Sequence, residues 1–197
     1  MRLLLLGASG TIGRATAAEL LRRGHEIVAL RRRIASGRTA SGATVPDPAS
    51  STSACSTAAS LGGLAWREVD FDDPQSLLTK GIAGEHFDAV VSCMASRSGA
   101  PRDAWAVDHR AHLNMLQAMQ AAGIGQMVLL SAICVQKPLL AFQQAKRAFE
   151  AALMDSGLRY SIVRPTAFFK SLSGQVDRVR QGQPFLLFGN GELTACK

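Results

Sequence analysis

Glycines at three-residue intervals form the first stretch whose residue types and spacing could do chemistry. Gly7, Gly10 and Gly13 follow four consecutive leucines and precede a helical pattern over residues 14–23. A short apolar run is typical of a buried parallel strand. Glycines at a strand-to-helix turn let backbone N–H groups approach a pyrophosphate, and the helix N-terminus faces its charge. This context predicts a dinucleotide site; a plain tight turn is the alternative. The expected contacts are Gly7, Ser9, Gly10, Thr11, Ile12 and Gly13.

Three arginines follow the next predicted strand, which covers residues 26–30. Arg31, Arg32 and Arg33 come directly after it, about 20 residues beyond the glycines, where the adenosine ribose lies in a dinucleotide-binding fold. An acidic residue there would bind the 2′-hydroxyl of NAD. Arginines instead suit the 2′-phosphate of NADP, because a guanidinium binds phosphate through paired hydrogen bonds. We therefore expect NADPH, with Arg31 as the leading contact and Arg32 beside it. A solvated basic turn is the alternative.

Two further strand ends carry residues that could contact the same cofactor. Asp70 follows the predicted strand 64–69 and is expected near the adenine edge. Arg164 follows the predicted strand 159–163 and is expected to brace the nicotinamide side. Both expectations rest on the rule that ligands of open α/β sheets lie at the carboxyl ends of the strands.

A serine and a lysine are the candidate catalytic residues. Ser131 ends the predicted strand 126–131, and Lys146 lies four residues after Phe142 in the helix that follows Pro138. Lys146 could hold the nicotinamide ribose hydroxyls or supply a proton, directly or through water. Ser131 could bind the cofactor or the substrate. The structural alternatives are an exposed helix lysine and a helix cap.

Strand and helix patterns alternate along the chain. Strands are expected over residues 3–6, 26–30, 64–69, 87–93, 126–131, 159–163 and 184–188. Helices are expected over residues 14–23, from residue 74, over 102–122, after Pro138 and over 168–180. Such alternation predicts an α/β fold, a Rossmann-like doubly wound parallel sheet with helices on both faces.

The domain organisation follows from this alternation. Residues 1–166 are expected to form an NAD(P)-binding Rossmann-like domain, and residues 167–197 the start of a small C-terminal substrate subdomain. Residues 34–63 are rich in Ala, Ser, Thr and Gly and show no helical or strand period. We therefore expect a flexible surface insertion there.

Composition bounds the class of protein. The chain has 197 residues, 47% of them hydrophobic, and a formal net charge of +7. No apolar run reaches the roughly 18 residues of a transmembrane helix, and the N-terminus lacks a signal-peptide pattern, so we expect a cytoplasmic protein. Basic residues without interleaved aromatics do not predict nucleic-acid binding, although the charge is compatible with weak peripheral contact with an anionic membrane. The scattered cysteines and histidines form no metal-ligand pattern.

Four stretches carry a resemblance to a known family. Residues 90–97, 129–138, 160–172 and 188–197 are similar to the NADPH-dependent 8-vinyl reductases of chlorophyll and bacteriochlorophyll synthesis. The Gly-x-x-Gly-x-x-Gly spacing resembles the atypical, NmrA-like branch of the short-chain dehydrogenase/reductase superfamily. The resemblance implies an oxidoreductase that reduces the 8-vinyl group of divinyl (proto)chlorophyllide a to ethyl.

The resemblance also implies substrate contacts. Arg97 and Lys137 lie on loops at carboxyl ends of strands, where either could pair with the propionate of the substrate. Phe168 and Phe169 could offer a face to its flat macrocycle. Solvated surface charges and a buried aromatic pair are the structural alternatives.

The sequence departs from the family pattern in two places. The Tyr-x-x-x-Lys pair of the superfamily occurs here as Phe142-x-x-x-Lys146, so the phenol is missing. Carbonyl reduction needs a proton donor at the oxygen, whereas reduction of a vinyl group conjugated to a macrocycle forms no oxyanion. Family members also continue past the position of Lys197, so we expect the chain to be C-terminally truncated and its substrate subdomain incomplete.

Two other interpretations stay open at this point. An NmrA-like regulatory or sensor protein would keep the NADP site without catalysis. A truncated fragment would fold poorly and expose an apolar patch. The retained Lys146 and the long similarity over residues 129–172 favour the enzyme. The oligomeric state is left open.

Overall fold

The computed structural model describes residues 1–33, 64–166 and 170–186. The predicted insertion at residues 34–63, together with residues 167–169 and 187–197, lies outside the described residues.

Parallel strands form one sheet in the order β3-β2-β1-β4-β5-β6. The order reverses between β1 and β4, as in doubly wound dinucleotide-binding folds. The predicted Rossmann-like sheet is therefore confirmed. The strands are β1 (Arg2–Leu6), β2 (Glu26–Arg32), β3 (Ala65–Val69), β4 (Ala89–Ser92), β5 (Gln126–Leu130) and β6 (Arg159–Val163).

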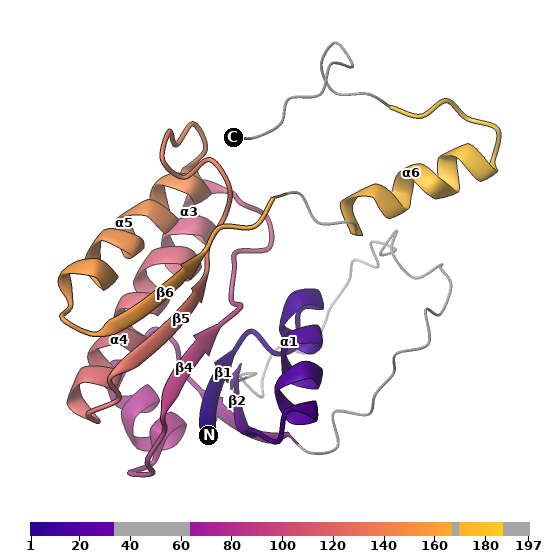
Figure 1. Ribbon diagram of the computed structural model, residues 1–197. Helices are drawn as coiled ribbons and strands as arrows, with labels where there is room; N and C mark the ends of the chain where they lie inside the picture. Colours follow the sequence, from indigo (N-terminus) through magenta and orange to yellow (C-terminus); the bar gives the residue numbers. More distant parts are fainter. Residues whose placement is uncertain (34–63, 167–169, 187–197) are drawn as a thin grey trace, which may run out of the picture.

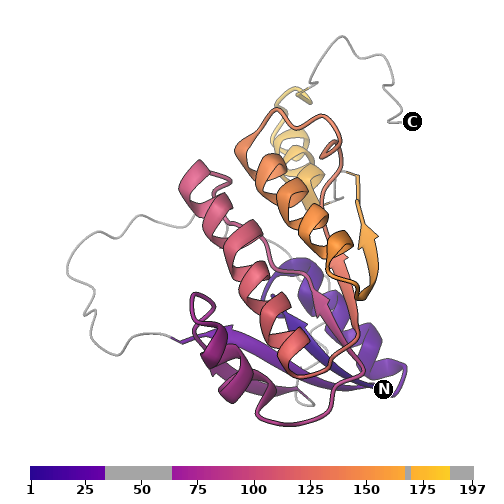
Figure 2. The ribbon, with the colours of Figure 1, turned by 90° about the vertical axis from the view of Figure 1, so that its left-hand side faces the viewer.

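Helices cover both faces of this sheet. Figure 1 shows α1 on one face and α3, α4 and α5 on the other. In Figure 2, α3, η2 and α4 form one long rod beside α5. The helices are α1 (Thr11–Arg22), α2 (Pro74–Ser76), α3 (Pro101–Ala104), α4 (His112–Ala121), α5 (Ala141–Asp155) and α6 (Lys170–Arg180), with π-helical segments η1 (Leu77–Ile82) and η2 (Trp105–Ala111).

The leucines of β1 divide the core into two parts. Leu4 and Leu6 are fully buried in the larger apolar cluster, which includes Met115 of α4. Leu5 is fully buried in the smaller cluster with Ala17 of α1. Successive side chains of a strand point to opposite faces, so burial of consecutive leucines requires helices on both faces of the sheet.

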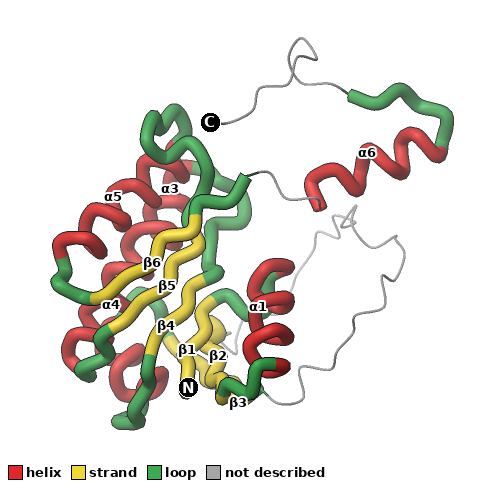
Figure 3. Tube along the Cα trace, in the orientation of Figure 1, coloured by secondary structure: helices red, strands yellow, loops and turns green. Residues whose placement is uncertain are grey.

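The strand register brings the carboxyl ends of the strands together. Leu6 of β1 is level with Leu30 of β2 and Ser92 of β4. Leu130 of β5 is level with Val163 of β6. Figure 3 shows the loops that leave these ends gathered along one edge of the sheet. In open α/β sheets, ligands bind at this edge.

Two helices contain π-helical segments that the sequence pattern did not predict. The expected helix 102–122 is present, but its middle is η2, and α2 continues into η1. A π-helical turn closes its hydrogen bonds over five residues and changes which side chains face inward. In η2 the buried residues are Val107, Asp108 and Ala111.

The expected start of the first helix differs from the structure. The helix α1 begins at Thr11 rather than at residue 14, because the N–H of Arg14 already donates to the carbonyl of Gly10 at 2.9 Å. The helix N-terminus therefore starts directly at the glycine turn.

The strand expected over residues 184–188 is wrong in its described part. Residues 184–186 pair with no strand among the described residues. Pro184 has no N–H to donate, and the N–H of Leu186 donates to Gln175 Oε1 of α6 at 3.1 Å. Residues 187 and 188 lie outside the described residues. The division at residue 166 stays a prediction, and Figure 1 shows α6 apart from the sheet.

None of the described helices is both long enough and apolar enough to cross a membrane.

Gly13→Ala is expected to destabilise the fold. A Cβ on Gly13 would lie 2.0 Å from the carbonyl oxygen of Gly7, so backbone must move. We expect a loss of about 3 kcal/mol or more in the free energy of unfolding, which lowers Tm by roughly 6–12 °C. Gly125→Ala is the matched control, because a Cβ there meets nothing within 4 Å. Thermal melts that show equal Tm values for the two variants would contradict the packing argument.

Candidate functional site

The three glycines of the first turn have different packing environments. Gly7 has a φ of +77°, and a Cβ on it would lie 2.7 Å from the backbone of Cys93. Gly13 is equally confined by Gly7. Gly10 is exposed, and a Cβ on it would meet only the Gly7 carbonyl oxygen, at 3.4 Å. Packing therefore requires Gly7 and Gly13, whereas the space beside Gly10 is open for a ligand.

A cavity of about 690 Å³ lies against this turn. This volume falls within the range of pockets that bind small molecules and cofactors. We name it the nucleotide cavity. Its lining residues are Gly7, Ser9, Gly10, Leu30, Arg31, Arg32, Phe71, Cys93, Met94, Ala95, Arg97, Ser98, Asp103 and Val107.

Some of the predicted cofactor contacts line the nucleotide cavity and others do not. Gly7, Ser9 and Gly10 line the nucleotide cavity, as do the two predicted arginines. The other predicted contacts of the glycine turn do not line it and belong to the first turn of α1: Thr11, Ile12 and Gly13.

The two predicted arginines differ in their partners. Arg31 Nη2 lies 2.7 Å from Glu68 Oε1, in an exposed ion pair. Arg32 lines the same cavity and has no ion-pair partner among the described residues. Arg32, unlike the expected leading residue Arg31, is therefore available to an anionic group at the end of β2.

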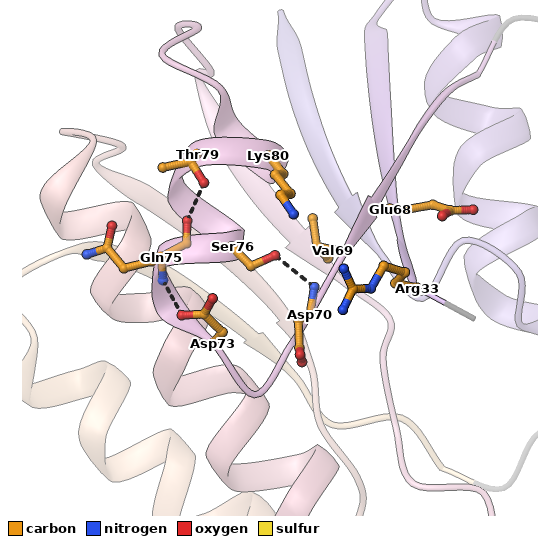
Figure 4. A pocket seen from close by; sticks show the side chains of 9 residues that line it. All are labelled: Arg33, Glu68, Val69, Asp70, Asp73, Gln75, Ser76, Thr79 and Lys80. Carbon is orange, nitrogen blue, oxygen red and sulfur yellow. Dashed lines mark hydrogen bonds between the residues drawn. The ribbon is translucent and has the colours of Figure 1, made fainter. Parts of the chain in front are cut away.

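Asp70 lies in a different cavity from the glycines. Figure 4 shows it beside Arg33 and Lys80 in a hollow of about 170 Å³. Its carboxylate accepts the N–H of Asp72 at 2.9 Å, and its own N–H donates to Ser76 Oγ at 2.9 Å. Asp70 therefore shapes the turn before α2 and does not line the nucleotide cavity, where the adenine edge was expected.

A second cavity, of about 320 Å³, adjoins the first. The two share Ala95, Arg97 and Ser98 of the loop that follows β4. We name it the lysine cavity. Its lining residues are Ala95, Ser96, Arg97, Ser98, Gly99, Leu130, Ser131, Ala132, Phe142 and Lys146. Both predicted catalytic residues therefore face one cavity, next to the position where a phenol is missing.

Lys146 is buried in an ion pair that the sequence did not suggest. Its Nζ lies 3.0 Å from Asp108 Oδ1, and the two side chains are 8% and 0% exposed. The alternative of a solvated helix lysine is therefore wrong. In the sequence, Asp108 looks like an ordinary polar residue on the exposed face of a helix. In the structure it lies in the π-helical segment η2 and is buried.

Ser131 carries an unsatisfied buried hydroxyl. The residue is 5% exposed, and its Oγ has no hydrogen-bond partner among the described residues. Its N–H donates to the carbonyl of Val163 at 2.8 Å. The helix α5 begins ten residues later, so the helix-cap alternative is wrong. A buried hydroxyl without a partner is unfavourable, so a ligand in the lysine cavity is the expected partner.

A buried histidine supports the wall of the site. His112 Nδ1 lies 2.8 Å from the carbonyl oxygen of Val107, and its Nε2 lies 2.8 Å from Ser92 Oγ. A carbonyl oxygen only accepts, so Nδ1 carries the proton and Ser92 donates to Nε2. Burial, and next the charge of Lys146, lower the pKa of His112 to about 4. His112 is therefore neutral at pH 7 and anchors the end of β4.

The remaining predicted residues lie in varied places. Arg97 lines both cavities, whereas Lys137 is exposed and lines neither. Arg164 also lines neither, and its Nη2 pairs with the buried Glu150 at 2.5 Å; its place beside the nicotinamide stays a prediction. This hydrogen bond raises the pKa of Arg164. The predicted Phe168 and Phe169 lie outside the described residues.

Among the described residues, no group of three or more His, Cys, Asp or Glu side chains could hold a metal ion.

Comparison with known proteins identifies the family. The sequence model of the NAD(P)H-binding family matches residues 7–190. The chain belongs to this family. The expectation of a nicotinamide cofactor is thereby confirmed, and the glycine turn and the nucleotide cavity both fall within the matched range.

Relatives of this NAD(P)H-binding protein include plant enzymes. The divinyl chlorophyllide a 8-vinyl-reductase of Zea mays is 46% identical over 98% of this chain and 47% of the relative. That of Arabidopsis thaliana is 44% identical over 100% and 46%. The photosystem II assembly factor Ycf39 of Synechocystis is 28% identical over 89% and 47%. The chain therefore spans about half the length of these curated relatives.

Solved structures agree on the fold. UDP-glucose 4-epimerase of Thermotoga maritima superposes with a TM-score of 0.71 at 17% identity, over 98% of this chain and 67% of that one. The enzyme WbmH of Bordetella bronchiseptica, solved with NAD+, gives 0.65 at 19% identity, over 92% and 63%. At such identities the likeness shows the fold alone.

The neutral state of His112 is expected to make stability depend on pH. An unfolded chain binds the proton below its ordinary pKa of 6.5, whereas the folded chain binds it only below about 4. Stability therefore falls as the pH drops from 6.5 towards 4, by about 3 kcal/mol from this group. Urea unfolding at several pH values should show that His112→Leu loses less stability over this interval than the wild type. His86→Gln, at an exposed position, should keep the wild-type dependence, and equal slopes for all three proteins would contradict the assignment.

Proposed function

We propose that this chain binds NADPH and reduces the 8-vinyl group of divinyl (proto)chlorophyllide a to ethyl, as part of a divinyl chlorophyllide a 8-vinyl-reductase. One observation carries the proposal: four plant proteins of that name are 44–46% identical to this chain over 98–100% of its length. The arrangement of the site supports it in three ways.

The nucleotide cavity suits a phosphorylated dinucleotide. The open space beside Gly10 lies at the N-terminus of α1, where backbone N–H groups and the helix dipole favour a pyrophosphate. Arg32 lies at the end of β2 and forms no ion pair among the described residues, whereas its neighbour Arg31 is paired with Glu68. A free cation there favours the 2′-phosphate of NADPH over the 2′-hydroxyl of NADH.

The lysine cavity suits reduction of a carbon–carbon double bond. NADPH, when bound, supplies the hydride. Phe142 puts a hydrocarbon ring in the cavity wall, so no phenol protonates a developing alkoxide there. Lys146 supplies a positive charge in a mostly buried setting, where it stabilises nearby negative charge more strongly than in water. The Ser131 hydroxyl supplies a hydrogen-bond partner to the same ligand.

Arg97 is the better candidate for the carboxylate of the substrate. Its backbone N–H donates to Asp103 Oδ2 at 3.0 Å, which holds the loop in place. Arg97 lines both cavities, whereas Lys137 lines neither. An arginine in this position could bind the propionate through two parallel hydrogen bonds.

A sensor that binds NADPH without consuming it is the second candidate. The missing phenol at Phe142 is the observation that favours it. The four plant relatives named as reductases, 44–46% identical to this chain, favour the enzyme.

Turnover separates these candidates. Purified protein is incubated with NADPH and divinyl chlorophyllide a, and the pigment is followed by absorption and mass spectrometry. The enzyme is expected to add about two mass units per vinyl group reduced, and Lys146→Ala should slow the reaction by about 100-fold or more. Arg147→Ala, at the exposed neighbouring position, should not. A version extended with the C-terminal half of the maize relative is tested in parallel; NADPH binding without turnover in both versions would favour the sensor.

Gly10→Ala is expected to weaken cofactor binding without loss of stability. A Cβ at this position fits the protein, since its one neighbour lies at 3.4 Å, but it fills space assigned to the pyrophosphate. We expect the Kd for NADPH, measured by fluorescence titration, to rise about tenfold, equivalent to about 1.4 kcal/mol. Gly125→Ala serves as the control. An unchanged Kd would place the pyrophosphate elsewhere.

A further inference from the structure

The carboxylate of Asp108 is the most buried charge of the site. It projects from η2, its side chain is 0% exposed, and it lies 3.0 Å from Lys146 Nζ of α5. The N–H of Ser96 also points to it, at 3.3 Å from Oδ1. Asp108 therefore joins three segments: a π-helical turn, the helix that carries the lysine, and the loop that lines both cavities.

Each member of the Asp108–Lys146 pair depends on the other. Burying a lone charge is strongly unfavourable, so a buried ammonium needs a carboxylate and a buried carboxylate needs a cation. Glu150 lies one helical turn beyond Lys146, but Arg164 occupies it. Asp108 is the one carboxylate that contacts Lys146 among the described residues.

The titratable group packed beside the Asp108–Lys146 pair does not form an ion pair with either member. His112, on the helix that continues η2, is neutral above a pKa of about 4 and is engaged by Ser92 and Val107. An ammonium has three N–H donors. Lys146 Nζ lies 3.0 Å from Asp108 Oδ1, and Lys146 also lines the lysine cavity, so the same ammonium can meet the carboxylate and a ligand.

We propose that Asp108 is a positioning residue for Lys146. It holds the ammonium of Lys146 at the wall of the lysine cavity, where the ammonium meets hydroxyl groups of the nicotinamide ribose. In a site without a phenol, this carboxylate is the group that orients the lysine. The proposal rests on the proposed cofactor site and adds to it the residue on which Lys146 depends.

A double-mutant cycle tests the proposal. Asp108→Asn and Lys146→Met are made singly and together, and the Kd for NADPH is measured by fluorescence titration alongside thermal melts. If Asp108 acts through the lysine, each single variant raises the Kd about tenfold, and the double variant binds no more weakly than Lys146→Met alone. The double variant should also melt at a higher temperature than either single variant, because each single variant leaves one buried charge unpaired and the double variant leaves none.

Asp103→Asn is the matched control. Asp103 holds the same loop, through the N–H groups of Arg97 and Ser98, but has no contact with Lys146. Its effect on the Kd should therefore be the same with Lys146 and with Met at that position. Equal effects of Asp108→Asn in both backgrounds would overturn the proposal, because Asp108 would then act only through the loop.

The experiment still tests the proposal if the single Asp108 variant does not fold, and it separates this proposal from the proposed reaction. If Asp108→Asn does not fold, Lys146→Met is compared directly with the double variant, and weaker NADPH binding by the double variant overturns the proposal. NADPH binding requires no chlorophyllide. A failure of vinyl reduction with intact coupling therefore contradicts the proposed reaction and leaves the role of Asp108 supported.

Discussion

Backbone contact between the end of β1 and the loop after β4 is the constraint on which the site depends. The two segments approach so closely at Gly7 and Cys93 that a side chain on Gly7 has no room. The N–H of Cys93 donates to the carbonyl of Leu6 at 2.9 Å, which continues the sheet up to this point. Because β1 and β4 flank the reversal of strand order, the contact places the start of α1 and the β4 loop side by side. The nucleotide cavity lies against this contact, and the lysine cavity adjoins it along the loop after β4.

Paired burial describes most of the polar groups behind the cavities. Lys146 has Asp108, Arg164 has Glu150, and the His112 ring has a hydrogen bond at each nitrogen. Buried charges persist in a fold when a partner compensates for lost hydration. The Ser131 hydroxyl departs from this rule among the described residues. This hydroxyl lacks a hydrogen-bond partner within the described part of the protein, whereas the buried charges nearby are paired. We therefore expect a bound ligand to supply that hydrogen bond.

The sequence predicted the sheet well because local patterns determine it. Four leucines before a glycine turn indicate a buried strand at any position in a chain, and alternation of strands and helices indicates parallel pairing. Of the residues predicted in the same way, Gly7, Ser9 and Gly10 line the nucleotide cavity, and Ser131 and Lys146 line the lysine cavity. Three pairings did not, because they join distant residues: Arg31–Glu68, Glu150–Arg164 and Asp108–Lys146. The last also depends on a π-helical turn, which leaves no hydrophobic period to detect.

The wall common to the two cavities has a thermodynamic consequence. Ala95, Arg97 and Ser98 face both spaces, so a ligand that shifts this wall in one cavity changes the shape of the other. Binding free energies are reciprocal: if the first occupant alters the affinity of the second by some factor, the second alters that of the first by the same factor. A ligand in the nucleotide cavity and a ligand in the lysine cavity that both shift this loop therefore bind with coupled affinities, whichever of the two binds first.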